Sequence, residues 1–314
     1  VVVAYTTPLA KPYSGAIRLL RSSDGGATFA APVTVHHDRQ VITHRFESIA
    51  FDAHGKLHTV WVDKRDLELA KAAVPKSGGV KPSYRGAAIY RNVSVDGGAT
   101  FGPDTKVADY SCECCRIALT QTPDGQVAAL WRHVFAPNIR DHAFALLGDA
   151  AAPGAPPVRA TFDNWAVDAC PHHGRALTPA AGGGYHAVWF GEKAEREQVQ
   201  AQVRYGRLAP DGAPTGAVQA LPDEQAQHAD VLSAGQRVRE PALIAVSRIE
   251  NRLALPFVER CATGSAGADG ERADRAGHAG HDGRAAGAGA TALARGHEDH
   301  VGALEHLVDL VAVV

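Results

Sequence analysis

Residues 94–131 read SVDGGATFGPDTKVADYSCECCRIALTQTPDGQVAALW, and this stretch carries the signal that decides the fold. Its first eight residues, SVDGGATF, contain Asp-Gly and Gly-Gly pairs, which supply the positive φ angles of a tight hairpin turn. Ser, Asp and Thr side chains can bond the amides of such a turn. The pattern recurs as SSDGGATF at residues 22–29. A turn pattern that occurs twice indicates a repeated strand–turn–strand unit.

A second repeat supports this interpretation, because apolar strand patterns ending near a Trp recur along the chain. They read LHTVWVD at residues 57–63, QVAALW at residues 126–131 and YHAVWF at residues 185–190. Trp61 and Trp131 follow the two turn octapeptides at nearly equal spacing. An internal repeat of this length is typical of propeller blades, so we expect antiparallel hairpins at these positions.

The octapeptide resembles the Asp-box, or bacterial neuraminidase repeat, of the sialidase-like β-propellers. The resemblance implies an all-β fold of four-stranded antiparallel blades, with each Asp-box at the turn between the two outer strands. We expect six blades in the complete protein, with about four in residues 1–237. In this family the repeat is structural, so it indicates the fold and not an activity.

Composition and chain ends limit the function classes. The 314 residues carry a formal net charge of −2, which gives no basic field for a nucleic-acid partner. No apolar run reaches the roughly 20 residues of a membrane-spanning helix. The chain begins VVVAYTTPLA without Met or a signal-peptide pattern, so we expect a truncated N-terminus. We expect an extracytoplasmic protein, periplasmic or secreted.

Two segments do not fit the repeat. Residues 64–83 are polar and rich in Lys, Ala and Gly, which predicts a long loop. Residues 238–314 lack Trp, Tyr and Lys and are rich in Ala, Gly, Arg, His and Asp. This composition is typical of a disordered low-complexity tail, and a shifted reading frame would explain it equally. The last fourteen residues could form a short helix.

Blade geometry predicts where a ligand would bind. The start of the innermost strand and the end of the second strand share one face, and the Asp-box turns lie on the other. Three blades then present an arginine at the start of the first strand, and sialidases clamp a substrate carboxylate with three arginines from different blades. Structural pairing of each arginine with a carboxylate is the alternative. The expected ligand-binding residues are Arg45, Glu47, Arg65, Arg116, Arg132, Arg140 and Arg175.

The catalytic residues of a sialidase are not evident. The Arg-Ile-Pro signature of that family is missing before the first octapeptide, and no Tyr-Glu pair can be assigned as nucleophile and base. Asp63 and Asp66 are weak candidates for an acid or base, and Tyr205 is a weak candidate for a nucleophile. Whether the protein is an enzyme therefore stays open at this point.

Cysteines distinguish this chain from a plain sialidase. Cys112, Cys114 and Cys115 lie at the start of one blade and Cys170 at the matching position of the next, followed by His172 and His173. The group could bind a soft metal, with copper or zinc as candidates, or staple adjacent blades by a disulfide. We expect at least one of the three clustered cysteines to lie within disulfide reach of Cys170, with Cα atoms under about 7 Å apart.

These patterns predict an exported propeller that recognises a small-molecule or glycan ligand, a carboxylate or a soft metal at its central mouth. The alternatives are an exo-sialidase-type glycoside hydrolase and a structural or interaction propeller. A Tyr-Glu pair facing the arginines would favour the hydrolase, and a filled, uncharged mouth would favour the scaffold.

Overall fold

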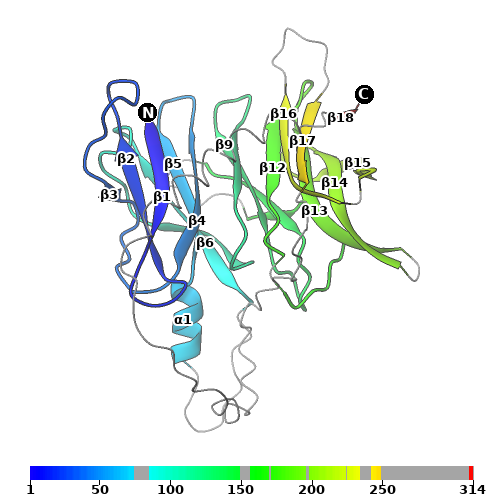
Figure 1. Cartoon of the computed structure of the whole chain (residues 1–314), viewed down its shortest axis with the longest axis horizontal. Coiled ribbons are helices and arrows are strands. Elements are labelled where there is room, and N and C mark those ends of the chain that lie inside the picture. Colours follow the sequence, from blue (N-terminus) through cyan, green and yellow to red (C-terminus); the bar gives the residue numbers. More distant parts are fainter. Residues whose placement is uncertain are drawn as a thin grey trace, which may run out of the picture. The chain divides into compact units, whose positions relative to one another are not determined.

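A computed structural model describes residues 1–73, 85–148, 156–169, 171–195, 198–223, 225–233, 242–248 and 311–313. Contacts divide the chain into one compact unit, Val1–Cys261 with Leu310–Val314, and a second unit, Ala262–Asp309. All the described structure belongs to the first unit. Its strands run along the sequence from β1 to β18, with a single described helix, α1 (Figure 1).

The described strands form five sheets, three of them with four strands and two with three. The first contains β1 (Val2–Pro8), β2 (Gly15–Arg21) and β3 (Val33–Thr34). The second contains β4 (His44–Phe51), β5 (Leu57–Asp63), β6 (Ala87–Ser94) and β7 (Thr105–Ser111). The third contains β8 (Ala118–Gln121), β9 (Val127–Arg132), β10 (His142–Leu146) and β11 (Val158–Arg159).

The fourth sheet contains β12 (Arg175–Pro179), β13 (Tyr185–Glu195), β14 (Gln198–Leu208) and β15 (Pro214–Ala220). The fifth contains β16 (Ala226–Ser233), β17 (Ala242–Arg248) and β18 (Val311–Val313). Neighbouring strands pair antiparallel in every sheet. The prediction of four-stranded antiparallel blades from sequential strands is therefore confirmed.

Three local details differ from the expectations or extend them. The described strands form five sheets, two of them three-stranded, and β17 and β18 continue beyond residue 237. Of the last fourteen residues, the structure describes Val311–Val313, which is a strand. The segment expected to be a loop contains α1 (Arg65–Ala72), where Asp66 and Glu68 in the first turn favour the helix dipole.

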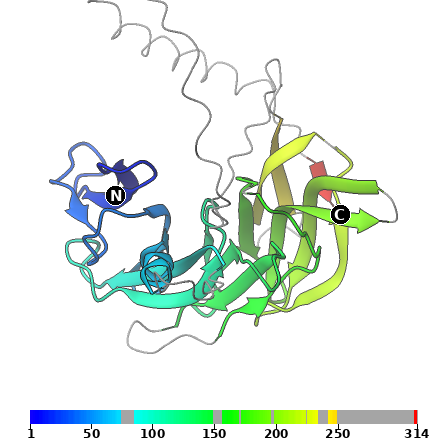
Figure 2. The same cartoon turned by 90° about the horizontal axis from the view of Figure 1, so that it is seen from below.

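Helix α1 lies against β6 (Figure 2). It buries a single side chain, Leu67. It is only eight residues long, and none of the described helices is long and apolar enough to span a membrane.

The core fills the spaces between consecutive sheets, and one Trp of each repeat lies within it. Trp61, Trp131 and Trp189 are at most 1% exposed. Trp61 packs with Ile17 and Leu19 of the first sheet, while Trp131 packs with residues of β5 and β6. Trp189 packs with residues of the third sheet. Each repeated Trp thus buries a large apolar surface against the preceding blade, which explains why the strand pattern recurs.

Both turn octapeptides adopt the same hydrogen-bonded turn between the last two strands of a sheet, β2 and β3 in the first sheet and β6 and β7 in the second. Asp96 Oδ1 accepts from the Thr100 amide at 2.9 Å, and Asp96 Oδ2 accepts from Thr100 Oγ1 at 2.6 Å. Asp24 makes the equivalent contacts with Thr28 at 2.9 and 2.5 Å. These hydrogen bonds, with Ser94, hold the pKa of the Asp96 carboxyl below its usual range.

The two ends of each blade have different contents. In the second sheet Leu57 pairs with Ser94 beside the octapeptide turn, while His44 pairs with Asp63 at the opposite end. The equivalent pairing in the fourth sheet places Arg175 opposite Trp189. The starts of the inner strands and the ends of the second strands therefore share one end, as predicted, and we call it the entry face.

Candidate functional site

Backbone strain is concentrated on the entry face. Three non-glycine residues with positive φ lie in or just before an inner strand: Phe46 at 58°, His172 at 51° and His228 at 51°. Tyr110, at 60°, lies near the end of the outer strand β7, and Asn164, at 55°, follows β11. Tyr13, at 61°, lies in the β1–β2 loop that reaches the same face. Such conformations are costly for L-residues and persist where the surrounding structure imposes them, often at functional sites.

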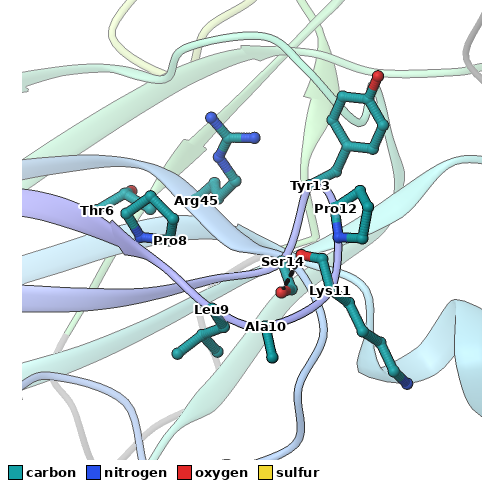
Figure 3. A pocket seen from close by; sticks show the side chains of 9 residues that line it. All are labelled: Thr6, Pro8, Leu9, Ala10, Lys11, Pro12, Tyr13, Ser14 and Arg45. Atoms are coloured by element: carbon teal, nitrogen blue, oxygen red, sulfur yellow. Dashed lines mark hydrogen bonds between the residues drawn. The ribbon is translucent and has the colours of Figure 1, made fainter. Parts of the chain in front are cut away.

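A pocket of about 400 Å³ opens beside the β1–β2 loop on this face (Figure 3). Arg45 joins the pocket from β4, where the pairing register shifts between Arg45 and Ser48. A bulge of this kind redirects side chains at a strand end. The lining residues are Thr6, Pro8, Leu9, Ala10, Lys11, Pro12, Tyr13, Ser14 and Arg45. The pocket therefore combines two cationic side chains with apolar walls and one aromatic ring.

Hydrogen bonds fix one wall of this pocket. Thr6 Oγ1 donates to Glu47 Oε2 at 2.6 Å, which ties β1 to β4. Ser14 Oγ donates to the Lys11 carbonyl at 2.6 Å and closes the loop. The Tyr13 ring is 64% exposed. A preformed loop with an exposed ring beside a guanidinium can receive a ligand without much ordering cost.

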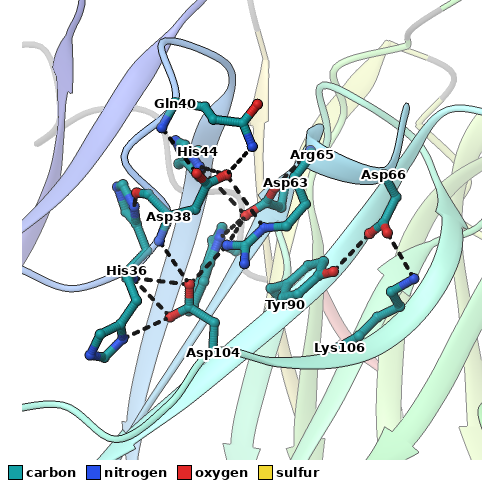
Figure 4. Close-up of polar contacts among 12 residues, drawn as sticks. His36, Asp38, Gln40, His44, Asp63, Arg65, Asp66, Tyr90, Asp104 and Lys106 are labelled. Atoms are coloured by element: carbon teal, nitrogen blue, oxygen red, sulfur yellow. Dashed lines mark hydrogen bonds and ion pairs between the residues drawn. The ribbon is translucent and has the colours of Figure 1, made fainter. Parts of the chain in front are cut away.

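A buried ionic network lies where β5 meets α1 (Figure 4). Asp63 is fully buried and accepts from Trp61 Nε1 at 2.9 Å and from the Arg65 guanidinium at 2.7 Å. The same Arg65 nitrogen donates to Asp104 Oδ2 at 2.9 Å. These partners hold the pKa of Arg65 above its usual value against the opposing effect of burial. Arg65, expected to bind a ligand, here joins α1 to two carboxylates.

The other catalytic candidates also have defined partners. Asp66 accepts from Tyr90 Oη at 2.8 Å and from Lys106 Nζ at 3.0 Å. Tyr205 lies on β14, a third strand, with its hydroxyl 2.7 Å from His186 Nδ1. Asp63 and Asp66 are both engaged by cationic side chains. A catalytic role for Asp63, Asp66 or Tyr205 stays a prediction.

The three predicted clamp arginines have different surroundings. Arg45 lines the pocket, Arg116 is exposed, and Arg175 is only 6% exposed. Arg175 donates to the His173 carbonyl at 3.0 Å. Their convergence on one ligand therefore stays a prediction.

Arg132 and Arg140 form a buried pair behind the entry face. Arg132 donates to the carbonyls of Arg140 at 2.9 Å and Phe190 at 2.7 Å. Arg140 donates from Nε to the Val167 carbonyl at 2.8 Å, and its NH1 lies 3.5 Å from Cys112 Sγ. Arg132 thus bridges two carbonyls, whereas Arg140 bridges one carbonyl and the Cys112 sulfur.

Cys112 and Cys115 are 0% and 2% exposed, and both are thiols rather than disulfide-bonded. Their sulfur atoms lie 3.4 Å apart, and Cys112 Sγ lies 3.9 Å from Cys114 Sγ. The hydrogen bond from Cys112 and the positive charges of Arg175 and Arg132 lower the pKa of Cys115, against the effect of burial. The same hydrogen bond and burial raise the pKa of Cys112. One negative charge is thus favoured on this pair, at Cys115.

Cys114 differs from Cys112 and Cys115, because its sulfur is disulfide-bonded. Cys170 lies outside the described residues, so the predicted bridge to it stays a prediction. His173 packs against Phe190, with ring centroids 3.8 Å apart, and burial lowers its pKa to about 4. His172 adopts a positive φ at the entry to β12.

Two described groups have ligand atoms close enough for a metal ion, within 4.8 Å of one another. One is Cys112, Cys114 and Cys115, and the other is Asp38, His44 and Asp63. Thiolates suit copper(I) or zinc, but the disulfide withdraws Cys114 from coordination. The Asp38–His44–Asp63 group already contacts Arg65, which a cation would have to displace. Zinc or copper binding by either group stays a prediction.

Comparison with solved structures identifies the fold. The trans-sialidase from Ruminococcus gnavus aligns with a TM-score of 0.53 and 8% identity, over 79% of this chain and 74% of that chain. A polysaccharide lyase, an ulvan lyase of family PL25, aligns with a TM-score of 0.52 and 11% identity, over 81% of this chain and 63% of that chain. An α-L-arabinofuranosidase from Fusarium graminearum aligns with a TM-score of 0.50 and 13% identity, over 79% and 70%.

The chain has a sialidase-like β-propeller fold. At these identities the likeness shows the fold alone. No protein-family model matches the chain, and no curated protein matches its sequence. The function must therefore be argued from the residues of the entry face.

Sequence reasoning missed the pocket beside the β1–β2 loop. The sequence patterns predict no ligand-binding role for residues 8–15, PLAKPYSG. Two prolines flanking a lysine, followed by an aromatic residue, were the available signal for a stiff, exposed loop. The partner Arg45 was expected on the correct face, but its approach to this loop depends on the contact between two sheets.

Proposed function

We propose that this propeller binds a carboxylate-bearing saccharide on its entry face, in the pocket formed by the β1–β2 loop and Arg45. The observation that carries the proposal is this pocket of about 400 Å³, with Arg45, Lys11 and Tyr13 in its wall. Its size is within the range of small-molecule sites. Its charge and aromatic content suit an acidic sugar.

Each of these three side chains has a distinct role in the proposal. The Arg45 guanidinium matches a carboxylate with two parallel N–H donors. Lys11 adds a second positive charge at the rim of the loop. The exposed Tyr13 ring offers an apolar face to a sugar ring and a hydroxyl to its polar edge. The Thr6–Glu47 hydrogen bond keeps the Arg45 side of the pocket in place.

The proteins that share the fold support a glycan as the ligand class. Their names describe a trans-sialidase, an ulvan lyase and an arabinofuranosidase, all of which act on carbohydrates. A small-molecule or glycan partner and an extracytoplasmic location are part of the same proposal. In the proposed clamp, Arg116 and Arg175 would complete the contact begun by Arg45.

Titration calorimetry with sialyllactose and with a glucuronate oligosaccharide tests this proposal. Arg45→Ala should weaken binding by about 10- to 100-fold, since a charged hydrogen bond contributes about 1.5–3 kcal/mol. Tyr13→Ala should weaken binding without changing the charge of the pocket. Lys71→Ala is the matched control, because Lys71 lies on α1 in a surface pair with Glu68. Equal affinity of the Arg45→Ala and Lys71→Ala variants would refute the site.

A hydrolase is the second candidate, favoured by the fold shared with the trans-sialidase. A fluorogenic sialoside separates hydrolysis from binding, because a pure binder produces no product. If turnover occurs, Asp63→Asn, Asp66→Asn and Tyr205→Phe would show whether the predicted catalytic residues carry it.

For Cys114 we propose Cys170 as the disulfide partner, because the two precede the inner strands of adjacent blades in the sequence. Peptide mapping without reduction tests this pairing directly. A bridge from Cys114 to Cys261 instead of Cys170 would refute it.

A further inference from the structure

Cys112 and Cys115 have the spacing C-x-x-C and meet inside the protein. Their sulfur atoms are 3.4 Å apart, and both side chains are almost completely buried. A disulfide bond is about 2 Å long, so bond formation requires the sulfurs to approach by only about 1 Å. The pair packs with Val134, which makes the surroundings of the sulfurs apolar on one side.

The charges around the pair distinguish between two uses of buried thiols. Arg140 NH1 lies 3.5 Å from Cys112 Sγ, and the hydrogen bond with Cys112 and the positive charges of Arg175 and Arg132 lower the pKa of Cys115. Nearby guanidinium groups stabilise a thiolate, which is the reactive form of cysteine. The same positive charges oppose the approach of a metal cation. The surroundings therefore favour thiolate chemistry over metal binding.

We propose that Cys112 and Cys115 form an oxidisable dithiol that a small hydroperoxide converts to a disulfide. Cys115 is the attacking residue, because the hydrogen bond with Cys112 and the positive charges of Arg175 and Arg132 lower its pKa and because it directly precedes the exposed Arg116. A hydroperoxide such as hydrogen peroxide is little larger than water, which suits a buried pair. Bulky disulfide reagents are excluded by the same burial.

The reaction proceeds in two balanced steps. The Cys115 thiolate attacks one peroxide oxygen, the O–O bond breaks, and hydroxide leaves and takes up a proton to become water. Cys115 is then a sulfenic acid. The Cys112 sulfur next attacks the Cys115 sulfur, the S–O bond breaks, and the hydroxide takes the Cys112 proton to form a second water. Two thiols lose two electrons and two protons, and the peroxide is reduced.

Cys114 does not take part in this reaction. It lies 3.9 Å from Cys112, but its sulfur is already in a disulfide. The outcome can therefore be read from residues 107–116, VADYSCECCR, a tryptic fragment that follows Lys106 and ends at Arg116. Only two of its three cysteines should accept an alkylating label before oxidation.

The test treats the full chain with hydrogen peroxide, unfolds it, alkylates it without reduction and maps the fragment by mass spectrometry. After peroxide treatment we expect neither Cys112 nor Cys115 to carry an alkyl label, and the fragment to weigh two hydrogens less than the unlabelled dithiol. This result holds whether or not the fragment is cross-linked through Cys114. In Cys112→Ser, Cys115 should stop at the sulfenic acid and react with dimedone. In Cys115→Ser, dimedone should not label Cys112. Ser111→Ala should behave as the unmodified protein.

Arg175→Met should slow the oxidation several-fold, since it removes a charge that favours the thiolate. The rate measured on the unmodified protein keeps the test decisive if a variant does not fold. Retention of both labels after peroxide treatment would overturn the proposal. Stoichiometric zinc or copper that blocks the oxidation of the purified protein would also overturn it.

Discussion

Replacement of Asp104 tests whether the buried ionic network holds the first two sheets together. The Asp104 side chain is 4% exposed and accepts from Arg65 at 2.9 Å and from the His37 amide at 3.0 Å. It also accepts from the Asp38 amide at 3.3 Å and from Asn92 Nδ2 at 3.3 Å. One carboxylate thus joins the segment before β4, the start of α1 and β6.

The magnitude follows from these contacts. The Arg65 contact is a charged hydrogen bond worth about 1.5–3 kcal/mol, and the Asn92 contact is a neutral one worth about 1 kcal/mol. Water can replace the contacts to the amides of His37, which is exposed, and Asp38, which is half-buried. Asp104→Ala should therefore lower the free energy of unfolding by about 3 kcal/mol. Asp104→Asn keeps an acceptor oxygen and should cost about half as much.

Urea unfolding followed by Trp fluorescence measures this change, with Asp109→Ala as the matched control. Asp109 is on β7, the strand that begins directly after Asp104, but it contacts Lys106 at the surface, with 40% of its side chain exposed. Such surface pairs contribute about 0–1 kcal/mol. Equal losses for the Asp104→Ala and Asp109→Ala variants would show that the network does not stabilise the fold.

The pH dependence gives a second measure of the same residue. Burial raises the pKa of Asp104, but the hydrogen bonds and charges of its partners, Arg65 first, leave it below the ordinary value. A carboxyl with a lowered folded pKa contributes stability that is present above its unfolded pKa of about 4. This contribution is lost as the pH falls through the folded pKa. The difference between Asp104→Ala and the unmodified protein should therefore shrink below about pH 4.

Two further predictions concern packing and acid stability. Gly212→Ala should lower the free energy of unfolding by about 3 kcal/mol or more, because the added Cβ would lie 2.1 Å from the Phe144 ring. Gly216 also has a positive φ but has open space around it, so Gly216→Ala should lower the free energy of unfolding by only about 1–2 kcal/mol. Thermal unfolding measures both changes. Equal shifts in melting temperature would contradict this packing. Burial lowers the pKa of His36 and His133 to about 4, so the unfolded state binds more protons between about pH 6.5 and 4. The urea midpoint should fall as the pH drops through this range, and a constant midpoint at pH 6.5 and pH 4.5 would refute the inference.

The sequence by itself determined the repeating unit of this protein. The two SxDGGxTF turns fixed hairpins locally, because their glycines adopt positive φ and their Asp side chains bond the turn amides. The strand patterns around Trp61, Trp131 and Trp189 then indicated the antiparallel blades. These features depend on contacts between residues close in sequence, which is why they could be predicted.

Tertiary structure alone decided which polar residues meet on the entry face and behind it. Asp63 was expected at the mouth, yet it is buried beneath Arg65 because α1 follows directly where a loop was expected. Arg45 reaches a pocket made by the β1–β2 loop, and the Arg140 guanidinium approaches Cys112 Sγ to 3.5 Å. Such contacts depend on how consecutive sheets pack against one another. That packing is determined by many residues together, so it leaves no periodic pattern in the sequence.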